Sequence, residues 1–93
     1  MTLKRFIKTE GITMNVPRIK RWSAVEIGFI GSNGYEDYTE FHVQHALTND
    51  GINELDKLYS DFCKDEKIPK DTVEYVSIRV TADTEDSLWE LAA

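Results

Sequence analysis

Apolar and polar residues alternate along two neighbouring stretches of the chain, 22–31 (WSAVEIGFIG) and 39–47 (TEFHVQHAL). The apolar positions are Val25, Ile27 and Phe29 in the first stretch, and Phe41, Val43 and Leu47 in the second. The opposite faces hold Glu26 and Gly28, and then Glu40, His42 and Gln44. A period of two residues with a single apolar face is typical of strands that turn their other face to water. The pattern predicts an antiparallel hairpin with one buried and one polar face.

The loop of this hairpin must contain an odd number of residues, or carry a bulge. Asn33-Gly34 favours a two-residue type I′ turn. That register would place Glu40 on the apolar face, because directly paired residues share a face. A three-residue loop, Ser32 to Gly34 with Gly34 left-handed, and a five-residue loop, residues 33–37, both bring the apolar faces together. We favour the five-residue loop because it stacks large apolar residues of the two strands directly on one another.

A helix is predicted after the hairpin. Thr48 or Asn49 can cap its start, and Pro69 ends it at about Lys67. Apolar residues recur at three- and four-residue steps and predict a buried stripe of Ile52, Leu55, Leu58, Tyr59, Phe62 and Cys63. The acidic residues Asp50, Glu54, Asp61 and Asp65 fall in one sector of roughly 60° on the far side of the helix. The helix is therefore expected to pack on the sheet with an acidic outer face.

A further strand is predicted over residues 72–82 (TVEYVSIRVTA), with Val76, Ile78 and Val80 facing the core. The tail that follows, DTEDSLWELAA, predicts a short helix capped by Asp83. A final strand through Leu88 to Leu91 is the alternative for that segment.

The N-terminal segment carries a weaker pattern. Ile12, Met14 and Val16 alternate with polar residues and predict a short strand ended by Pro17. Residues 2–8 either extend that strand or lead into it as a loose basic arm. We leave these two alternatives open.

Together these elements predict an α+β fold of one domain, residues 1–93, in which residues 1–11 are the candidate loose arm. The expected architecture is a small antiparallel sheet of about four strands with one amphipathic helix on one face, in the order β-β-β-α-β, followed by a short C-terminal element. The hydrophobic content of 41% is that of an ordinary globular protein. The predicted core consists of Val25, Ile27, Phe29, Phe41, Val43, Ile52, Leu55, Tyr59, Phe62, Val76, Ile78 and Val80.

The charge is unevenly distributed along the chain, whose formal net charge is −6. Residues 1–22 contain six Lys or Arg residues and one acid, whereas residues 23–93 contain five bases and sixteen acids. A basic segment is thus joined to a strongly acidic body. Such an asymmetry bears on partners and solubility rather than on fold.

The residues that could carry chemistry form no catalytic or metal-binding motif. Cys63 lies on the apolar stripe of the helix, whereas a reactive cysteine needs a partly exposed and electropositive setting. His42 and His45 are three residues apart on a strand, so their rings point to opposite faces and cannot share a metal ion. The carboxylates fall on loops, polar strand positions and the outer helix face, where burial does not raise their pKa values. We expect no enzyme activity, no metal ion and no cofactor.

The cellular location follows from what the sequence lacks. No apolar run approaches the roughly 20 residues of a membrane helix, and the N-terminus has no apolar core of a secretory signal. The one cysteine cannot form an internal disulfide bond. These features predict a cytoplasmic protein without membrane partners.

The most distinctive stretch is SNGYEDYTEF, residues 32–41, which puts three carboxylates and three aromatic rings into the hairpin tip and the strand after it. Tyrosine is enriched at protein interfaces, whereas solubility requires only charge. The pattern predicts a partner-binding surface made of Tyr35, Glu36, Asp37, Tyr38 and Glu40, together with the helix acids Glu54, Asp61 and Asp65.

An acidic surface of this kind is complementary to a basic protein, and many basic surfaces hold DNA or RNA. The function predicted from the sequence is a non-enzymatic binding module that acts as an inhibitor or modulator of a nucleic-acid-binding protein. Phage anti-restriction and anti-CRISPR proteins share this profile of size and charge, which is a likeness of composition and not of any motif.

Two alternatives come from the basic segment. Arg18, Lys20, Arg21 and Trp22 combine phosphate-binding charges with a ring that can stack on a base, as in a nucleic-acid-binding accessory protein. We rank direct nucleic-acid binding second because the acidic body repels a polyanion. The other alternative is a self-associating structural subunit, in which the basic segment of one copy binds the acidic body of another.

Overall fold

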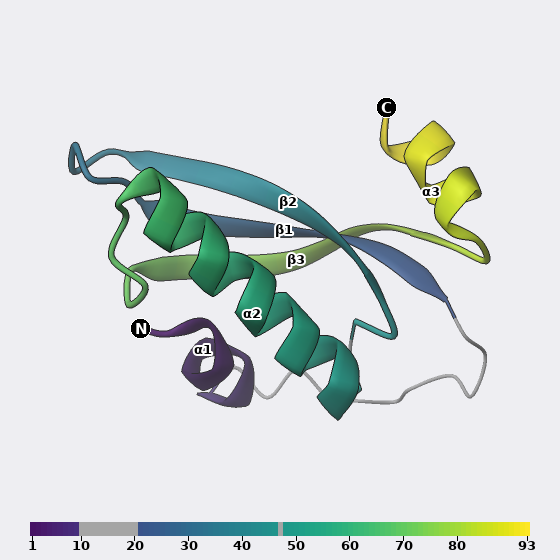
Figure 1. Ribbon diagram of the computed structural model, residues 1–93, viewed down its shortest axis with the longest axis horizontal. Coiled ribbons are helices and arrows are strands. Elements are labelled where there is room, and N and C mark those ends of the chain that lie inside the picture. The colour runs from purple at the N-terminus through teal and green to yellow at the C-terminus, as the bar shows by residue number, and fades with distance from the viewer. Residues whose placement is uncertain (10–20, 47) are drawn as a thin grey trace.

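The computed structural model describes residues 1–9, 21–46 and 48–93 (Figure 1). Its elements are α1 (Leu3–Thr9), β1 (Trp22–Ile30), β2 (Glu36–Gln44), α2 (Asn49–Glu66), β3 (Val73–Ala82) and α3 (Glu85–Ala92). The described strands form one antiparallel sheet in the order β2-β1-β3. The predicted α+β class is confirmed, with three described strands in place of about four and with helices at both ends. The strand expected at Ile12 to Val16 and the apolar Leu47 lie outside the described residues.

The central strand β1 has two different faces, and each supports a different hydrophobic cluster. Ser23, Val25, Ile27 and Phe29 are buried on the covered face, which α2 and α1 pack against (Figure 1). Trp22, Ala24, Glu26 and Gly28 lie on the other face. At one end of that face, α3 packs Leu88 on Ala24 and Ala82. The rest of that face, which we call the open face, has no helix among the described elements over it.

The long helix α2 begins and ends where the sequence predicts. Thr48 is the N-cap, and its hydroxyl accepts a hydrogen bond from the Gly51 N–H at 3.0 Å. Lys67 is the C-cap in a left-handed conformation, with φ of 57°. Leu55, Tyr59 and Cys63 are buried. Ile52, Leu58 and Phe62 are partly buried against the same cluster, so the predicted stripe is the packing face of the helix.

The hairpin loop has three residues, Ser32 to Gly34. Gly31 donates to the Tyr35 carbonyl at 2.8 Å, and Gly34 is left-handed with φ of 80°. The expectation of an odd residue count is confirmed, but the favoured five-residue loop is wrong. A tight turn followed by a left-handed glycine matches the twist of the strands with fewer loop residues. Phe29 therefore pairs with Asp37 in the sheet and takes its aromatic contacts from α2 instead.

Two irregularities in β3 change which of its residues reach the core. The β1–β3 register shifts between Ala24 and Val25 and again between Gly28 and Phe29. Such bulges add a residue to one strand and turn the following side chains to the other face. Val80 consequently packs with Ala24 on the face away from α2. Ile78 pairs with Val25 and stays on the covered face, but it is 38% exposed and is not a buried core residue as predicted. The assignment of Val80 to the core under α2 is therefore wrong.

The described residues at the N-terminus form a helix, α1. Leu3 and Ile7, four residues apart, are buried in the main core cluster. This spacing puts both side chains on one side of the helix. Residues 3–9 are thus neither a strand extension nor a loose arm, because two apolar anchors hold them to the core.

The C-terminal segment is the expected short helix, α3, rather than a strand. Its N-cap is Thr84, one residue after the predicted Asp83, and the Thr84 hydroxyl accepts from the Ser87 N–H at 3.1 Å. The Asp83 carboxylate instead lies near Arg21, with 3.7 Å between its Oδ1 and Nε of Arg21. Within residues 1–9, 21–46 and 48–93, no helix is both long and apolar enough to cross a lipid bilayer.

Candidate functional site

The open face gathers polar and aromatic side chains from all three strands. In the sheet register, Glu26 lies between Glu40 and Ser77, and Gly28 lies between Tyr38 and Tyr75. Directly paired residues point to the same side of a sheet. The face therefore contains two rows, one of two carboxylates and a serine, and one of two tyrosines on either side of Gly28.

Tyr75 lies across the backbone of Gly28. A Cβ atom on residue 28 would overlap the Cε1, Cδ1 and Cζ atoms of the Tyr75 ring. The Tyr75 hydroxyl donates to Oε2 of Glu26 at 2.7 Å. This hydrogen bond, followed by slight desolvation and the nearby charges of Glu26, Tyr38 and Glu36, raises the pKa of Tyr75. We call the ring held over Gly28 the Tyr75 platform.

Glu40 forms hydrogen bonds with residues of the fold and is not the unpaired, solvent-exposed carboxylate that the sequence predicts. Arg79 donates to Glu40 through Nε at 2.7 Å and through Nη2 to the Ala92 carbonyl at 2.9 Å. His42 Nε2 lies 3.2 Å from the same carboxylate. Burial alone would raise the pKa of Glu40, but the hydrogen bonds and charges of Arg79 and His42 outweigh it and lower that pKa. The Glu40–Arg79 pair thus joins β2 to β3, and Arg79 extends the link to the end of α3.

We expect this linkage to make stability depend on pH. Because the pKa of folded Glu40 lies below its ordinary value of 4.5, its contribution is present above that value and is lost as pH falls through the folded pKa. As the pH is lowered from 5 to 3, the free energy of unfolding measured with urea should fall more for the parent than for Glu40→Gln, because the glutamine has no proton to gain. Parallel pH profiles for the two proteins would contradict the role given to this carboxylate.

His42 lies on the polar face of β2, as predicted, but α3 covers it. Its ring centroid is 4.2 Å from that of Trp89, at an interplanar angle of 58°. Its side chain is only 10% exposed, and Nδ1 has no hydrogen-bond partner among the described residues. His42 is thus a packing residue beneath Trp89 and does not lie in water.

The remaining predicted residues of the hairpin are exposed. Tyr35, Glu36, Asp37 and Tyr38 all lie at the tip or just after it, and Tyr38 is 63% exposed. Glu36 and Tyr38 alternate with Asp37 along β2, so they share the open face whereas Asp37 points to the other side. Among the described residues, no cation lies within ion-pair distance of Glu26 or Glu36.

The predicted helix acids do not belong to the same surface. Glu54, Asp61 and Asp65 are exposed on α2, which packs on the covered face of the sheet (Figure 1). Their outward side is therefore directed away from the open face. The sequence-predicted binding set divides into a hairpin and open-face group and a separate helix group, and one flat partner surface cannot contact both.

The alternative nucleic-acid site is described only in part. Arg18 and Lys20 lie outside the described residues. Arg21 is exposed near Asp83, and Trp22 is half-buried against the cluster of Ala24, Ala82 and Leu88. The Trp22 ring thus already packs on the protein, which argues against a role in stacking on a base.

Two residues of the open face were missed as site residues from the sequence, Glu26 and Tyr75. A signal for them existed, because strand alternation places Tyr75 on the polar side of its strand. A glycine inside a strand also marks a close approach by another group. Only the register shows that this group is the Tyr75 ring.

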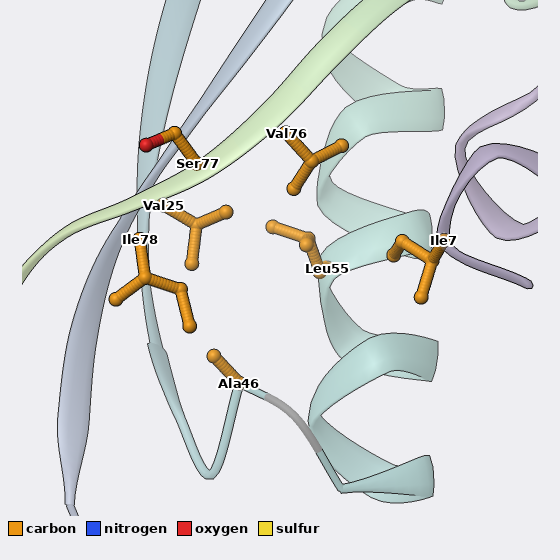
Figure 2. Close-up of a pocket in the computed structure, with 7 residues that line it drawn as sticks. All are labelled: Ile7, Val25, Ala46, Leu55, Val76, Ser77 and Ile78. Carbon is orange, nitrogen blue, oxygen red and sulfur yellow. The ribbon is translucent and has the colours of Figure 1, made fainter. Parts of the chain in front are cut away.

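The covered face contains an apolar cavity of about 330 Å³ between α1, α2 and the sheet. Figure 2 shows the residues around it, which are Ile7, Val25, Ala46, Leu55, Val76, Ser77 and Ile78. The Ser77 hydroxyl points away from the cavity, as its pairing with Glu26 requires. A specific ligand site needs a few convergent polar groups, and these walls present apolar side chains alone.

The described residues offer no assembled chemical centre. Cys63 is buried, and burial raises the pKa of its thiol. Among the described residues, no three His, Cys, Asp or Glu side chains are grouped to hold a metal ion. Comparison with protein-family models, curated proteins and solved structures found no match to this chain. The open face is therefore the candidate site by its own geometry.

Proposed function

We propose that this chain is a non-enzymatic binding module that docks its hairpin tip and open face on a basic protein surface. One observation carries the proposal: exposed Tyr38 and Tyr75 lie beside Glu26 and Glu36, neither of which forms an ion pair with a described cation. Tyrosine supplies contact area at a small cost in entropy, and exposed carboxylates steer a basic partner toward it.

In its sharper form, the proposal makes the partner a nucleic-acid-binding protein of the cytoplasm. Its basic groove would be occupied by carboxylates at positions where phosphates bind, so the chain would act as an inhibitor or modulator. The acidic body supports this form, since sixteen acids against five bases in residues 23–93 favour basic partners. The comparatively rigid strands hold the carboxylates in place, which reduces the ordering cost of binding.

Two variants with equal charge change test the proposal. Glu36→Lys with Asp37→Lys reverses the tip, and Glu54→Lys with Asp61→Lys reverses the outer side of α2. Glu40 is left unchanged because its reversal would break the contacts with Arg79 and His42. All four carboxylates are exposed, so each substitution should change stability by about 0.5 kcal/mol or less.

The two variants and the parent are used in parallel to capture partners from the source cell, and the affinity of each captured protein is measured. We expect a basic partner that binds the tip variant at least tenfold more weakly, because like charges meet at the contact. The helix variant should bind like the parent. Equal weakening of both variants would indicate attraction by net charge alone, and loss in the helix variant only would place the docking surface on α2; either result contradicts the proposal.

A further inference from the structure

Three observations at the open face point to a preference for one kind of side chain. The Tyr75 ring lies on Gly28, where no Cβ stands in its way, so its inner side is covered by backbone. Its hydroxyl is fixed by Glu26, yet Tyr75 is still 39% exposed. A ring held in this way presents its outer surface in a defined orientation before any partner arrives.

Most of the charges around this ring are negative. Tyr75 bonds one oxygen of the Glu26 carboxylate, Oε2, and no hydrogen bond or ion pair of Oε1 is present among the described residues. Glu36 shares the open face with Tyr38, which pairs with Gly28 from the other side. The nearby cation of the face, Arg79, is committed to Glu40 and to the Ala92 carbonyl.

On these grounds we infer that the Tyr75 platform binds an arginine side chain of the basic partner. The planar guanidinium stacks on the outer surface of the Tyr75 ring, and its N–H groups donate to the free oxygen of Glu26. Arginine suits the site better than lysine, because a guanidinium can stack and donate from its edge at once. The inference rests on the proposed function and names the partner group that this surface selects.

The arginine site can be tested without knowing the partner. The probe is the capped tripeptide Gly-Arg-Gly, titrated into the full chain while backbone amide signals are followed by NMR. Matched tripeptides carry lysine or citrulline in the central position; citrulline keeps the planar shape but has no charge. We expect saturable shifts around Glu26, Gly28 and Tyr75, at least threefold weaker binding of the lysine peptide, and no binding of the citrulline peptide.

Matched tyrosine variants locate the effect. Tyr75→Leu removes the ring and should weaken arginine binding at least threefold. Tyr35→Leu removes a ring that is more exposed, 74% against 39%, from the other side of the hairpin, and should change nothing. If Tyr75→Leu does not fold, Glu26→Gln serves instead, because it keeps an acceptor for the tyrosine hydroxyl and removes the charge. Equal affinity for the arginine and lysine peptides, or arginine binding that survives these variants, would overturn the inference.

Failure here is distinguishable from failure of the proposed function. If the tip variant no longer binds the captured partner but Tyr75→Leu still does, the docking surface stands and the arginine site is refuted. Conversely, if the chain binds Gly-Arg-Gly selectively but the captured partner binds the tip variant as tightly as the parent, the arginine site stands and the proposed docking is refuted.

Discussion

Phe29→Ala should lower the free energy of unfolding by about 3–5 kcal/mol, the usual cost of removing a fully buried aromatic ring. Phe29 is 1% exposed at the centre of the main cluster. Its ring centroid lies 5.6 Å from that of Phe62 and 6.2 Å from that of Tyr59. The substitution would open a cavity between β1 and α2. The rings of Phe62 and Tyr59 line this cavity, and neither can move into it without losing its own contacts.

Urea unfolding followed by tryptophan fluorescence measures this loss. Phe62→Ala is the comparison. The sequence predicts the same large cost for it, but the structure shows a partly buried ring that packs at the edge of the cluster. Phe62→Ala should therefore cost clearly less than Phe29→Ala. The reverse order would mean that the centre of the core lies nearer to Phe41 than to β1.

Gly51→Ala should destabilise the protein by about 3 kcal/mol, at the upper end of the cost of overpacking. In an ordinary helix this substitution stabilises by up to about 1 kcal/mol. Here a Cβ on residue 51 would overlap the backbone carbonyl of His45. That carbonyl cannot easily move, because it accepts both the N–H and the hydroxyl of Thr48, each at 2.8 Å.

The expected loss of stability is opposite in sign to the effect of the same substitution in an ordinary helix, so the two cases are easily told apart. Asn53→Ala, two residues further along the same helix at an exposed position, should be neutral or slightly stabilising. Both variants are compared with the parent by urea unfolding. A Gly51→Ala protein as stable as the parent would show that the turn before α2 does not approach the helix as closely as described.

The hairpin and α2 could be predicted because their signals are local. Alternation fixes the faces of β1 and β2, and the parity of the loop follows from making those faces coincide. For α2, Thr48 and Pro69 mark the ends, and the three- and four-residue spacing marks the buried side. In each case one stretch of sequence contains the whole argument.

The features that were predicted wrongly from the sequence depend on contacts between distant segments. The bulges of β3 exist only relative to β1, so Val80 could not be removed from the core by its own alternation. The helix α1 is short and is held by Leu3 and Ile7 against the core, and its sequence alone is compatible with other structures. Tertiary packing decides both.

The candidate site was predicted in part for the same reason. Exposed Tyr38 and Glu36 were found from the hairpin pattern, whereas the ion pair of Glu40 needs Arg79 from a strand that follows α2. The helix acids were placed correctly on the outside of α2. Their separation from the open face follows from which side of the sheet the helix covers, and the spacing of residues in the sequence does not contain that information.

Carboxylate footprinting of the complex is the most direct test of the proposed docking of a basic partner on the open face and the tip. Solvent-accessible carboxylates, including the half-buried Glu26, are labelled with a carbodiimide and glycine ethyl ester in the free chain and in the complex with the captured partner. Labelling of Glu26 and Glu36 should fall at least threefold in the complex, while Glu54, Asp61 and Asp65 should react as in the free chain. Protection of the helix acids with unchanged labelling of Glu26 and Glu36 would contradict the account.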